Sequence, residues 1–284
     1  MIVQDLISRI EKLQNQYKST FEKYKNPLLG LITSRWYFSD SFRLFLDTDV
    51  NWDNCGKVDL VSDMAKKLQE FDISTTTGSA FEKSVCSWYQ PYHYTPRTNW
   101  GVHIRYRCWG ILSARFNKEC PNLIENPLDS VKASFFYFYI HGLCHHIIEN
   151  VVSNVEIEHG DPLLYSNYLS YTYSEDFNTT GCLEESLANS YLFERSILCH
   201  IDQDYLKHEL LSQGEGYNGF INYVDSKFSY GLQKLISQIV KEYFDPHSKS
   251  KITKTLELAG FFNFSYIQNI PVWIHRMPLR TYTY

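Results

Sequence analysis

Apolar residues recur at helical spacing in several parts of the chain. From Val3 to Tyr24 they follow one another at steps of mostly three or four, with charged residues between them, which predicts an amphipathic helix over about residues 1–25. We expect this helix to pack on the core of the domain, and a heptad seam between two subunits is the alternative. Further helical patterns cover residues 58–71, 131–152, 183–201 and 230–244.

Two short segments alternate apolar and polar residues with the period of a β-strand. Residues 101–107 do so, which predicts a half-buried strand with His103 and Arg105 on its polar face. A second short strand is expected at residues 270–274. Together the elements predict an α+β fold that is helix-rich and has a small sheet.

Three segments follow neither period. Residues 72–79 are rich in turn-forming side chains and predict a surface loop. Prolines and aromatic rings at residues 89–94 predict irregular structure. Residues 158–181 are polar and rich in tyrosine, which predicts a long loop of the kind that is usually functional or mobile in a compact domain.

The composition is typical of a soluble globular protein. Of the 284 residues, 44% are apolar and 21% are charged, which excludes a disordered or repetitive chain. No apolar run approaches about 18 residues and the N-terminal segment has no secretory signal, so we expect no membrane span and a cytoplasmic location. A net charge of −5 leaves no broad basic surface for nucleic acid. We expect one domain over residues 1–284, and the oligomeric state stays open.

The seven cysteines are spread singly, at positions 55, 86, 108, 120, 144, 182 and 199. An odd, unclustered set without a CxxC pair predicts reduced thiols, which fits a cytoplasmic location. The same spacing excludes a zinc knuckle built from cysteines.

The candidate chemistry begins with two histidines in the segment FFYFYIHGLCHHIIEN, residues 135–150. His141 and His145 are four residues apart, so on the expected helix their imidazoles lie on one face, where both can reach a single Zn²⁺. The neighbouring His146 points about 100° away, and we expect it to face solvent or to support a ligand. We interpret Cys144 as a packing residue.

A second polar group opens the helical pattern at 183–201, in the segment GCLEESLANSYLFER. A carboxylate from a second helix, Glu184 or Glu185, would complete a three-ligand zinc site whose fourth position holds water. Asn189 follows Glu185 by four residues on the same helical face and could hydrogen-bond to a ligand histidine. The alternative for the glutamates is a charged first turn, which the helix dipole favours.

Together the two segments resemble the gluzincin metallopeptidases, which carry H-E-x-x-H on one helix and E-x-x-A-[DN] on the next. Locally they are similar to the minimal zincins of the ImmA/IrrE type, over residues 135–195. The resemblance implies a zincin-like core and a bound zinc ion. It implies that His141, His145 and Glu185 are the zinc ligands. It also implies that Asn189 and Glu184 support these ligands.

One position departs from the motif of that family. Gly142 stands where the family carries its catalytic glutamate, which takes a proton from the zinc-bound water. General acid–base help is worth roughly 10²–10⁴ in rate, so its loss predicts a site that binds metal and turns over poorly. The chain is then a natural pseudoenzyme, an inactivated variant, or an enzyme in which another carboxylate is the base.

Other carboxylates are poorly placed to be that base. Glu184 points away from the expected ligand face, and Glu149 lies two helical turns beyond Gly142. Glu158 and Asp161, in the expected loop, could approach the site only if that loop moved.

These patterns predict a zinc-binding, metallopeptidase-like protein that hydrolyses a peptide or protein substrate with a metal-activated water. Catalysis would be impaired because Gly142 replaces the base. The first alternative is a non-catalytic module that binds a peptide or protein, and the second is a structural helical protein. His103 and Arg105 would line the substrate cleft if their strand were an edge strand that pairs with an extended peptide; otherwise they occupy an ordinary exposed face.

Overall fold

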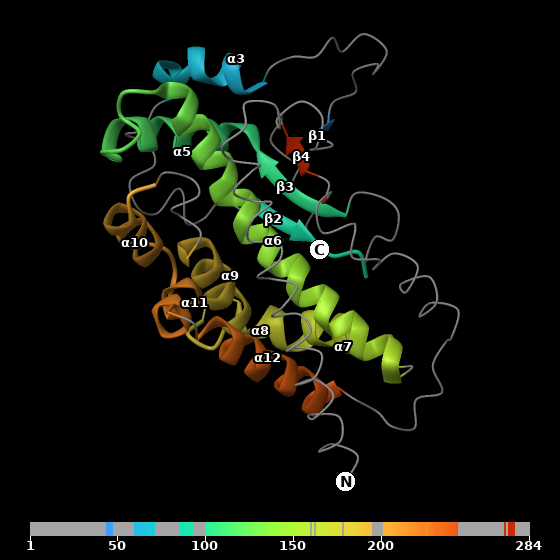
Figure 1. Cartoon of the computed structure of the whole chain (residues 1–284). Helices are drawn as coiled ribbons and strands as arrows, with labels where there is room; N and C mark the ends of the chain where they lie inside the picture. Colours follow the sequence, from blue (N-terminus) through green and yellow to red (C-terminus); the bar gives the residue numbers. More distant parts are fainter. Residues whose placement is uncertain are drawn as a thin grey trace. The chain divides into compact units, whose positions relative to one another are not determined.

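The structure is a computed structural model, drawn in Figure 1. It describes residues 44–47, 60–71, 86–93, 100–159, 161, 163–177, 179–194, 201–225, 227–243, 270 and 272–275. The N-terminal helix expected over 1–25 and the loop expected at 72–79 lie outside these residues. The chain forms two compact units, and helix α6 (Pro127–His159) has residues in both. A single domain over 1–284 stays a prediction.

The first unit, called here the sheet unit, comprises residues 35–143, 195–213 and 270–284. Its four-stranded sheet has the spatial order β1 (Leu44–Asp47), β4 (Val272–His275), β3 (Gly101–Arg105), β2 (Ser87–Gln90). Strand β4 runs parallel to both of its neighbours, and β2 runs antiparallel to β3. The short strand expected at 270–274 and the helix-rich α+β class with a small sheet are confirmed.

Strand β3 lies inside the sheet, so the expectation of a half-buried or edge strand is wrong. It pairs with β4 on one side and with β2 on the other, and residues 101–104 are all buried. The strand is also shorter than expected, because Tyr106 already belongs to a helix. Residues 89–90, expected to be irregular, pair with β3 as part of β2.

Helices α3 (Leu60–Lys66) and η2 (Leu68–Glu70) confirm the helical pattern at 58–71. Two further helices of the sheet unit, α5 (Tyr106–Glu119) and α10 (Gln203–Leu211), were not predicted. Helix α5 holds the beginning of α6 through buried hydrogen bonds. The Trp109 indole N–H donates to the carbonyl of Val131 at 3.0 Å, and Ser113 and Ser134 join their hydroxyls at 2.6 Å.

A disulfide joins Cys86 and Cys108, whose Cα atoms are 5.4 Å apart, so the expectation that all thiols are reduced is wrong. The bond links the residue before β2 to the first turn of α5, across 22 residues. Nothing in the spacing of the cysteines indicated this pair, because it depends on β2 and β3 lying side by side. The pairing of these strands brings Cys86 opposite Arg105. The backbone N–H of Arg105 donates to the carbonyl of Cys86 at 2.9 Å.

Helix α6 is longer at both ends than the pattern at 131–152 predicted. It begins at Pro127, and the side-chain oxygen of Asn126 accepts a hydrogen bond from the N–H of Leu128 at 3.1 Å, which makes Asn126 the cap. Asp129 lies inside the first turn. Residues 135–140 are all buried, so this part of α6 has no polar face.

The second unit, called here the helical unit, comprises residues 1–34, 144–194 and 214–269. Its described part contains the second half of α6 and a set of shorter helices. These are α7 (Leu164–Asn167), the π-helix η4 (Tyr168–Tyr173), α8 (Ser174–Asp176), α9 (Leu183–Glu194), α11 (Glu215–Asn218), the 3₁₀-helix η6 (Gly219–Tyr223) and α12 (Phe228–Tyr243).

Helices α9 and α12 confirm two of the predicted helices, although residues 195–200 lie outside the described part of the chain. The long loop expected at 158–181 is wrong: α6 continues to His159, and three short helices follow it. The segment packs through its rings, because Tyr165 and Tyr168 are buried. The sequence did not indicate these helices, because the segment carries large aromatic residues at irregular spacing in place of the periodic aliphatic pattern of a helix.

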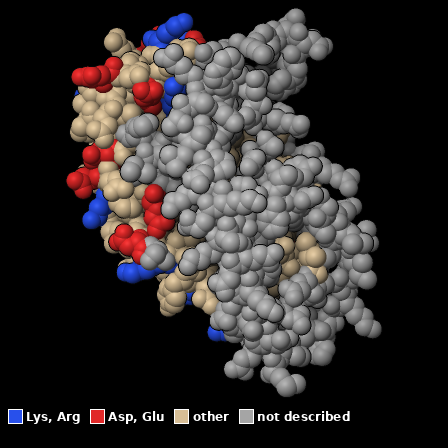
Figure 2. Space-filling view, in the orientation of Figure 1, with Lys and Arg blue, Asp and Glu red and all other residues tan. Residues whose placement is uncertain are grey.

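Charged side chains of both signs are interspersed over the described residues visible in Figure 2, and no large area of one sign is seen among them. Within the described ranges, no helix is both long enough and apolar enough to cross a bilayer.

Candidate metal centre

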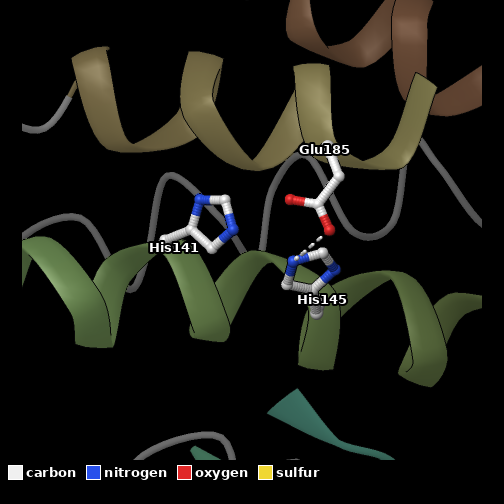
Figure 3. A group of neighbouring side chains, drawn as sticks. All are labelled: His141, His145 and Glu185. Carbon is white, nitrogen blue, oxygen red and sulfur yellow. Dashed lines mark ion pairs between the residues drawn. The ribbon is translucent and has the colours of Figure 1, made fainter. Parts of the chain in front are cut away.

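Three side chains from two helices converge at one point. His141 and His145 lie one turn apart on α6, and Glu185 lies in the first turn of α9. Figure 3 shows the carboxylate of Glu185 approaching the two imidazole rings. One ligand atom of each residue lies within 4.8 Å of the other two, and this is the one such group found among the residues that the structure describes. The structure thus brings together the three residues that the sequence predicted as ligands.

His145 lies between two carboxylates. Its Nδ1 is 2.7 Å from Oε1 of Glu184, and its Nε2 is 3.6 Å from Oε1 of Glu185. Burial lowers the pKa of His145, but the charge of Glu185 and the hydrogen bond to Glu184 outweigh burial and raise its pKa above the usual value. In the neutral ring, a carboxylate at Nδ1 requires the proton on that nitrogen, so the lone pair on Nε2 faces Glu185.

Two tyrosine hydroxyls support the glutamates from the segment that precedes α9. The hydroxyl of Tyr165 donates to Oε1 of Glu184 at 3.3 Å, and the hydroxyl of Tyr173 donates to Oε1 of Glu185. Sequence reasoning missed both residues because it interpreted their segment as a loop. The density of tyrosines at residues 165–173, directly before the two glutamates, is the signal that could have found them.

The donor set fits a zinc ion in chemistry and in spacing. Two imidazole nitrogens and one carboxylate oxygen are a known set for a three-ligand catalytic zinc. In a tetrahedral site with bonds of about 2.0–2.1 Å, neighbouring donor atoms are about 3.4 Å apart. The separation of 3.6 Å between Nε2 of His145 and Oε1 of Glu185 is close to that value. All three ligand atoms lie within 4.8 Å of one another. Small side-chain rotations on binding would therefore bring them to the spacing around a zinc ion.

The charge around the group also favours a cation. Glu184 and Glu185 are adjacent in sequence and almost fully buried, and Oε2 of Glu184 is buried without a hydrogen-bond partner. Two buried carboxylates facing one imidazole leave negative charge that is costly without a compensating positive charge. A divalent ion would supply that charge.

Gly142 faces strand β3 at very short range. A Cβ atom at this position would lie 2.6 Å from Cγ2 and 3.0 Å from Cγ1 of Val102, a fully buried side chain of the sheet. Both distances are well below an ordinary carbon–carbon contact of about 3.5–4.0 Å. Glycine is therefore required where α6 crosses β3, and the position has no room for a glutamate side chain. This packing explains Gly142 as part of the fold.

Asn189 is buried, and its side-chain amide donates to the backbone carbonyl of Tyr217 at 3.5 Å. The side chain that the structure places on the Nδ1 of His145 is Glu184. Of the two roles expected for His146, facing solvent is wrong, because the residue is only 1% exposed; support of a ligand stays a prediction. Burial lowers the pKa of His146 to about 4, and the charge of Glu149 opposes that shift. Cys144 is fully buried.

His103 and Arg105 do not line an edge strand, because β3 is paired on both sides. His103 is buried, its Nδ1 lies 2.8 Å from Nε2 of His275, and its ring stacks on those of Trp88 and Trp273. An extended peptide cannot pair with this strand, so the proposed role of the two residues in a substrate cleft loses its geometric basis. The polar residues of the alternating pattern lie on the second face of the interior strand β3, and this face is also covered.

The carboxylates weighed as substitute bases have other surroundings. Glu149 is fully buried, and the side chain of Asp161 accepts a hydrogen bond from the N–H of Leu163 at 3.3 Å. The side chain of Glu158 lies outside the described part. Glu184 contacts the ring nitrogen of His145 that points away from Glu185. None of these described contacts directs a carboxylate into the space between the three candidate ligands.

Comparison of the chain with protein-family models, with curated proteins and with solved structures gave no match.

Proposed function

We propose that this chain is a zinc-binding protein with a zincin-like, metallopeptidase-type core, in which His141, His145 and Glu185 hold the ion. The observation that carries the proposal is the convergence of two imidazoles and one carboxylate from helices α6 and α9. The hydrogen bond from His145 to Glu184 supports it, because it directs the free lone pair of the ring toward Glu185.

The reaction class that this donor set supports is hydrolysis of a peptide bond in a peptide or protein substrate. A zinc ion held by three protein ligands lowers the pKa of a bound water to about 7. The contribution of the chain is to hold the ligands, to exclude water around the buried glutamates, and to place the proton of the neutral His145 ring on Nδ1, beside Glu184. No side chain at position 142 can take the proton of the water, so we expect turnover slower by roughly 10²–10⁴ than with a base.

The second candidate function is a non-catalytic module that keeps the metal and binds a peptide or protein. The contact between Gly142 and Val102 favours it, because it makes the loss of the base a feature of the packing of α6 on β3. A chain inactivated by one recent substitution would instead retain space for the lost side chain.

Metal analysis of the whole chain tests the zinc site. We expect about one zinc per chain, lost in His145→Ala and retained in His208→Ala, an exposed histidine of α10 that serves as the control. A chain purified without chelators that takes up no zinc, or that keeps it in His145→Ala, would contradict the proposal.

Activity on a peptide library separates the two functions. A glutamate at position 142 needs space, so the variant to test is Gly142→Glu combined with Val102→Ala, with Val102→Ala alone as the control. Cleavage that appears only in the double variant and requires zinc supports the metallopeptidase-type core. If the double variant folds, binds zinc and stays inert, the binding module is supported.

A cytoplasmic location stays a prediction, and the disulfide between Cys86 and Cys108 argues for testing it, since such bonds are rare in reducing compartments. Fractionation of the native host with detection of the chain in each compartment is the direct measurement.

A further inference from the structure

A π-helix carries Tyr173, whose hydroxyl donates to Glu185 of the candidate metal centre. Helix η4 covers Tyr168–Tyr173, the segment YLSYTY, and precedes α9 in the helical unit. A π-helix closes its hydrogen bonds between residues five apart and is found frequently at functional sites. Tyr168 and Tyr173 are five apart, and their ring centroids lie within 6.2 Å of each other. The π-helical turn thus directs both rings to one side.

The hydroxyl of Tyr173 meets the particular oxygen that faces the imidazoles. It donates to Oε1 of Glu185, and the same Oε1 lies 3.6 Å from Nε2 of His145. A carboxylate oxygen has two lone pairs. The hydroxyl occupies one of them from the η4 side, so the other is directed toward the space between the rings.

The geometry points to Tyr173 as a positioning residue that holds Glu185 in the orientation in which Oε1 ligates a metal. This inference rests on the proposed function, because it assumes that Glu185 is a ligand. Tyr173 does not bind the ion itself. It acts through Glu185, as Glu184 acts through His145 on the other ligand.

The hydrogen bond has two consequences for the site. It restrains the rotation of the Glu185 carboxylate, so less ordering remains to be done when a metal binds. It also fixes which oxygen faces the ion and so favours ligation through that oxygen alone. Partners of this kind typically change metal affinity by roughly 10–100-fold when they are removed.

Tyr173→Phe in the full-length chain removes the hydroxyl and keeps the ring. The matched control is Tyr171→Phe, which removes a hydroxyl from the same π-helix at a side chain that is 62% exposed. Zinc affinity is measured by competition with a chromophoric chelator. The visible absorption of Co²⁺ bound in place of zinc reports the coordination geometry.

We expect Tyr173→Phe to weaken zinc binding by about 10–100-fold and to alter the Co²⁺ spectrum, with Tyr171→Phe unchanged in both. In a Glu185→Ala background the effect of Tyr173→Phe should fall below about twofold, because a residue that acts through Glu185 has nothing left to position. A purely structural role would lower the thermal midpoint and leave the Co²⁺ spectrum of the folded variant unchanged.

Equal zinc affinity and equal Co²⁺ spectra in Tyr173→Phe and the parent chain would overturn this inference and leave the zinc site standing. If Tyr173→Phe does not fold, the comparison of Glu185→Asp with Glu185→Ala decides. The shorter carboxylate loses the hydroxyl, so we expect it to bind zinc almost as weakly as Ala. An Asp variant that binds as tightly as the parent would refute the role of Tyr173. A parent chain that binds neither zinc nor Co²⁺ contradicts the proposed function itself.

Discussion

Replacing Gly142 by alanine separates two opposite effects on stability. In an unhindered helix interior, Gly→Ala stabilises the fold by about 1 kcal/mol, because glycine has the greater backbone freedom to lose. Here the added methyl group would lie 2.6 Å from one methyl of Val102 and 3.0 Å from the other. The steric effect and the helix propensity therefore predict opposite signs.

The steric effect should be the larger one. To reach an ordinary contact of about 3.5–4.0 Å, the valine or the helix must shift by about 1 Å. Val102 is fully buried in an interior strand and branches at Cβ, so it has no flexible end that could move aside. Overpacking of this kind costs about 1–3 kcal/mol, which leaves a net loss of up to about 2 kcal/mol after the gain of about 1 kcal/mol in helix propensity.

Urea unfolding of four chains measures this balance: the parent, Gly142→Ala, Val102→Ala and the double variant. We expect Gly142→Ala to lower the free energy of unfolding by up to about 2 kcal/mol. In the double variant the new methyl group occupies space that the valine vacated, so the two changes should couple favourably by at least about 1 kcal/mol. A Gly142→Ala chain more stable than the parent, with no coupling, would refute the close approach of α6 to β3.

Three further predictions concern charge, a covalent bond and a ligand support. Burial raises the pKa of Glu209, whereas Arg115, at 2.6 Å, holds it down. In Arg115→Met the pKa rises further, so stability should fall as the pH rises. The expected loss is about 2 kcal/mol at pH 8 and smaller at pH 5, where a larger fraction of Glu209 is protonated, and urea unfolding at both pH values checks it. Cys86 and Cys108 should resist alkylation in the unfolded, unreduced chain, and alkylation of both would contradict the disulfide. Cys108→Ser should lower the free energy of unfolding by about 3 kcal/mol, measured by urea unfolding. Glu184→Gln should weaken zinc binding by about 10–100-fold in the chelator assay, and an unchanged dissociation constant would contradict its action through His145.

The candidate metal centre was predictable from the sequence to the extent that its ligands lie on regular helices. Four-residue spacing places His141 and His145 on one face of α6 whatever surrounds that helix. Glu185 could be named because it begins a clear helical pattern. The role of Glu184 at Nδ1 of His145 depends on how α9 approaches α6, which sequence spacing alone does not determine.

The tyrosine supports could not be predicted from hydrophobic periodicity, because the segment that carries them has no helical period. Residues 168–173 form a π-helix, and its side chains repeat at a spacing that neither an α-helix nor a strand produces. The same limitation applies to α5, which follows β3 without an intervening loop. There the alternating pattern of the strand extended into the helix and concealed its start at Tyr106.

Long-range pairing accounts for the other corrections. The interior position of β3 is set by β4, which lies near the other end of the chain. The disulfide between Cys86 and Cys108 follows from the pairing of β2 with β3. Gly142 is a related case: a helix pattern shows that glycine is unfavourable there, but only the position of Val102 gives the reason.

X-ray absorption at the zinc edge of the zinc-loaded chain tests the central claim most directly, because it reports the atoms bound to the ion. The account predicts a four-coordinate zinc with two imidazole nitrogens at about 2.0–2.1 Å and one carboxylate oxygen, and loss of the zinc in His141→Ala as in His145→Ala. A zinc bound by thiolates, or only by oxygens, would contradict it.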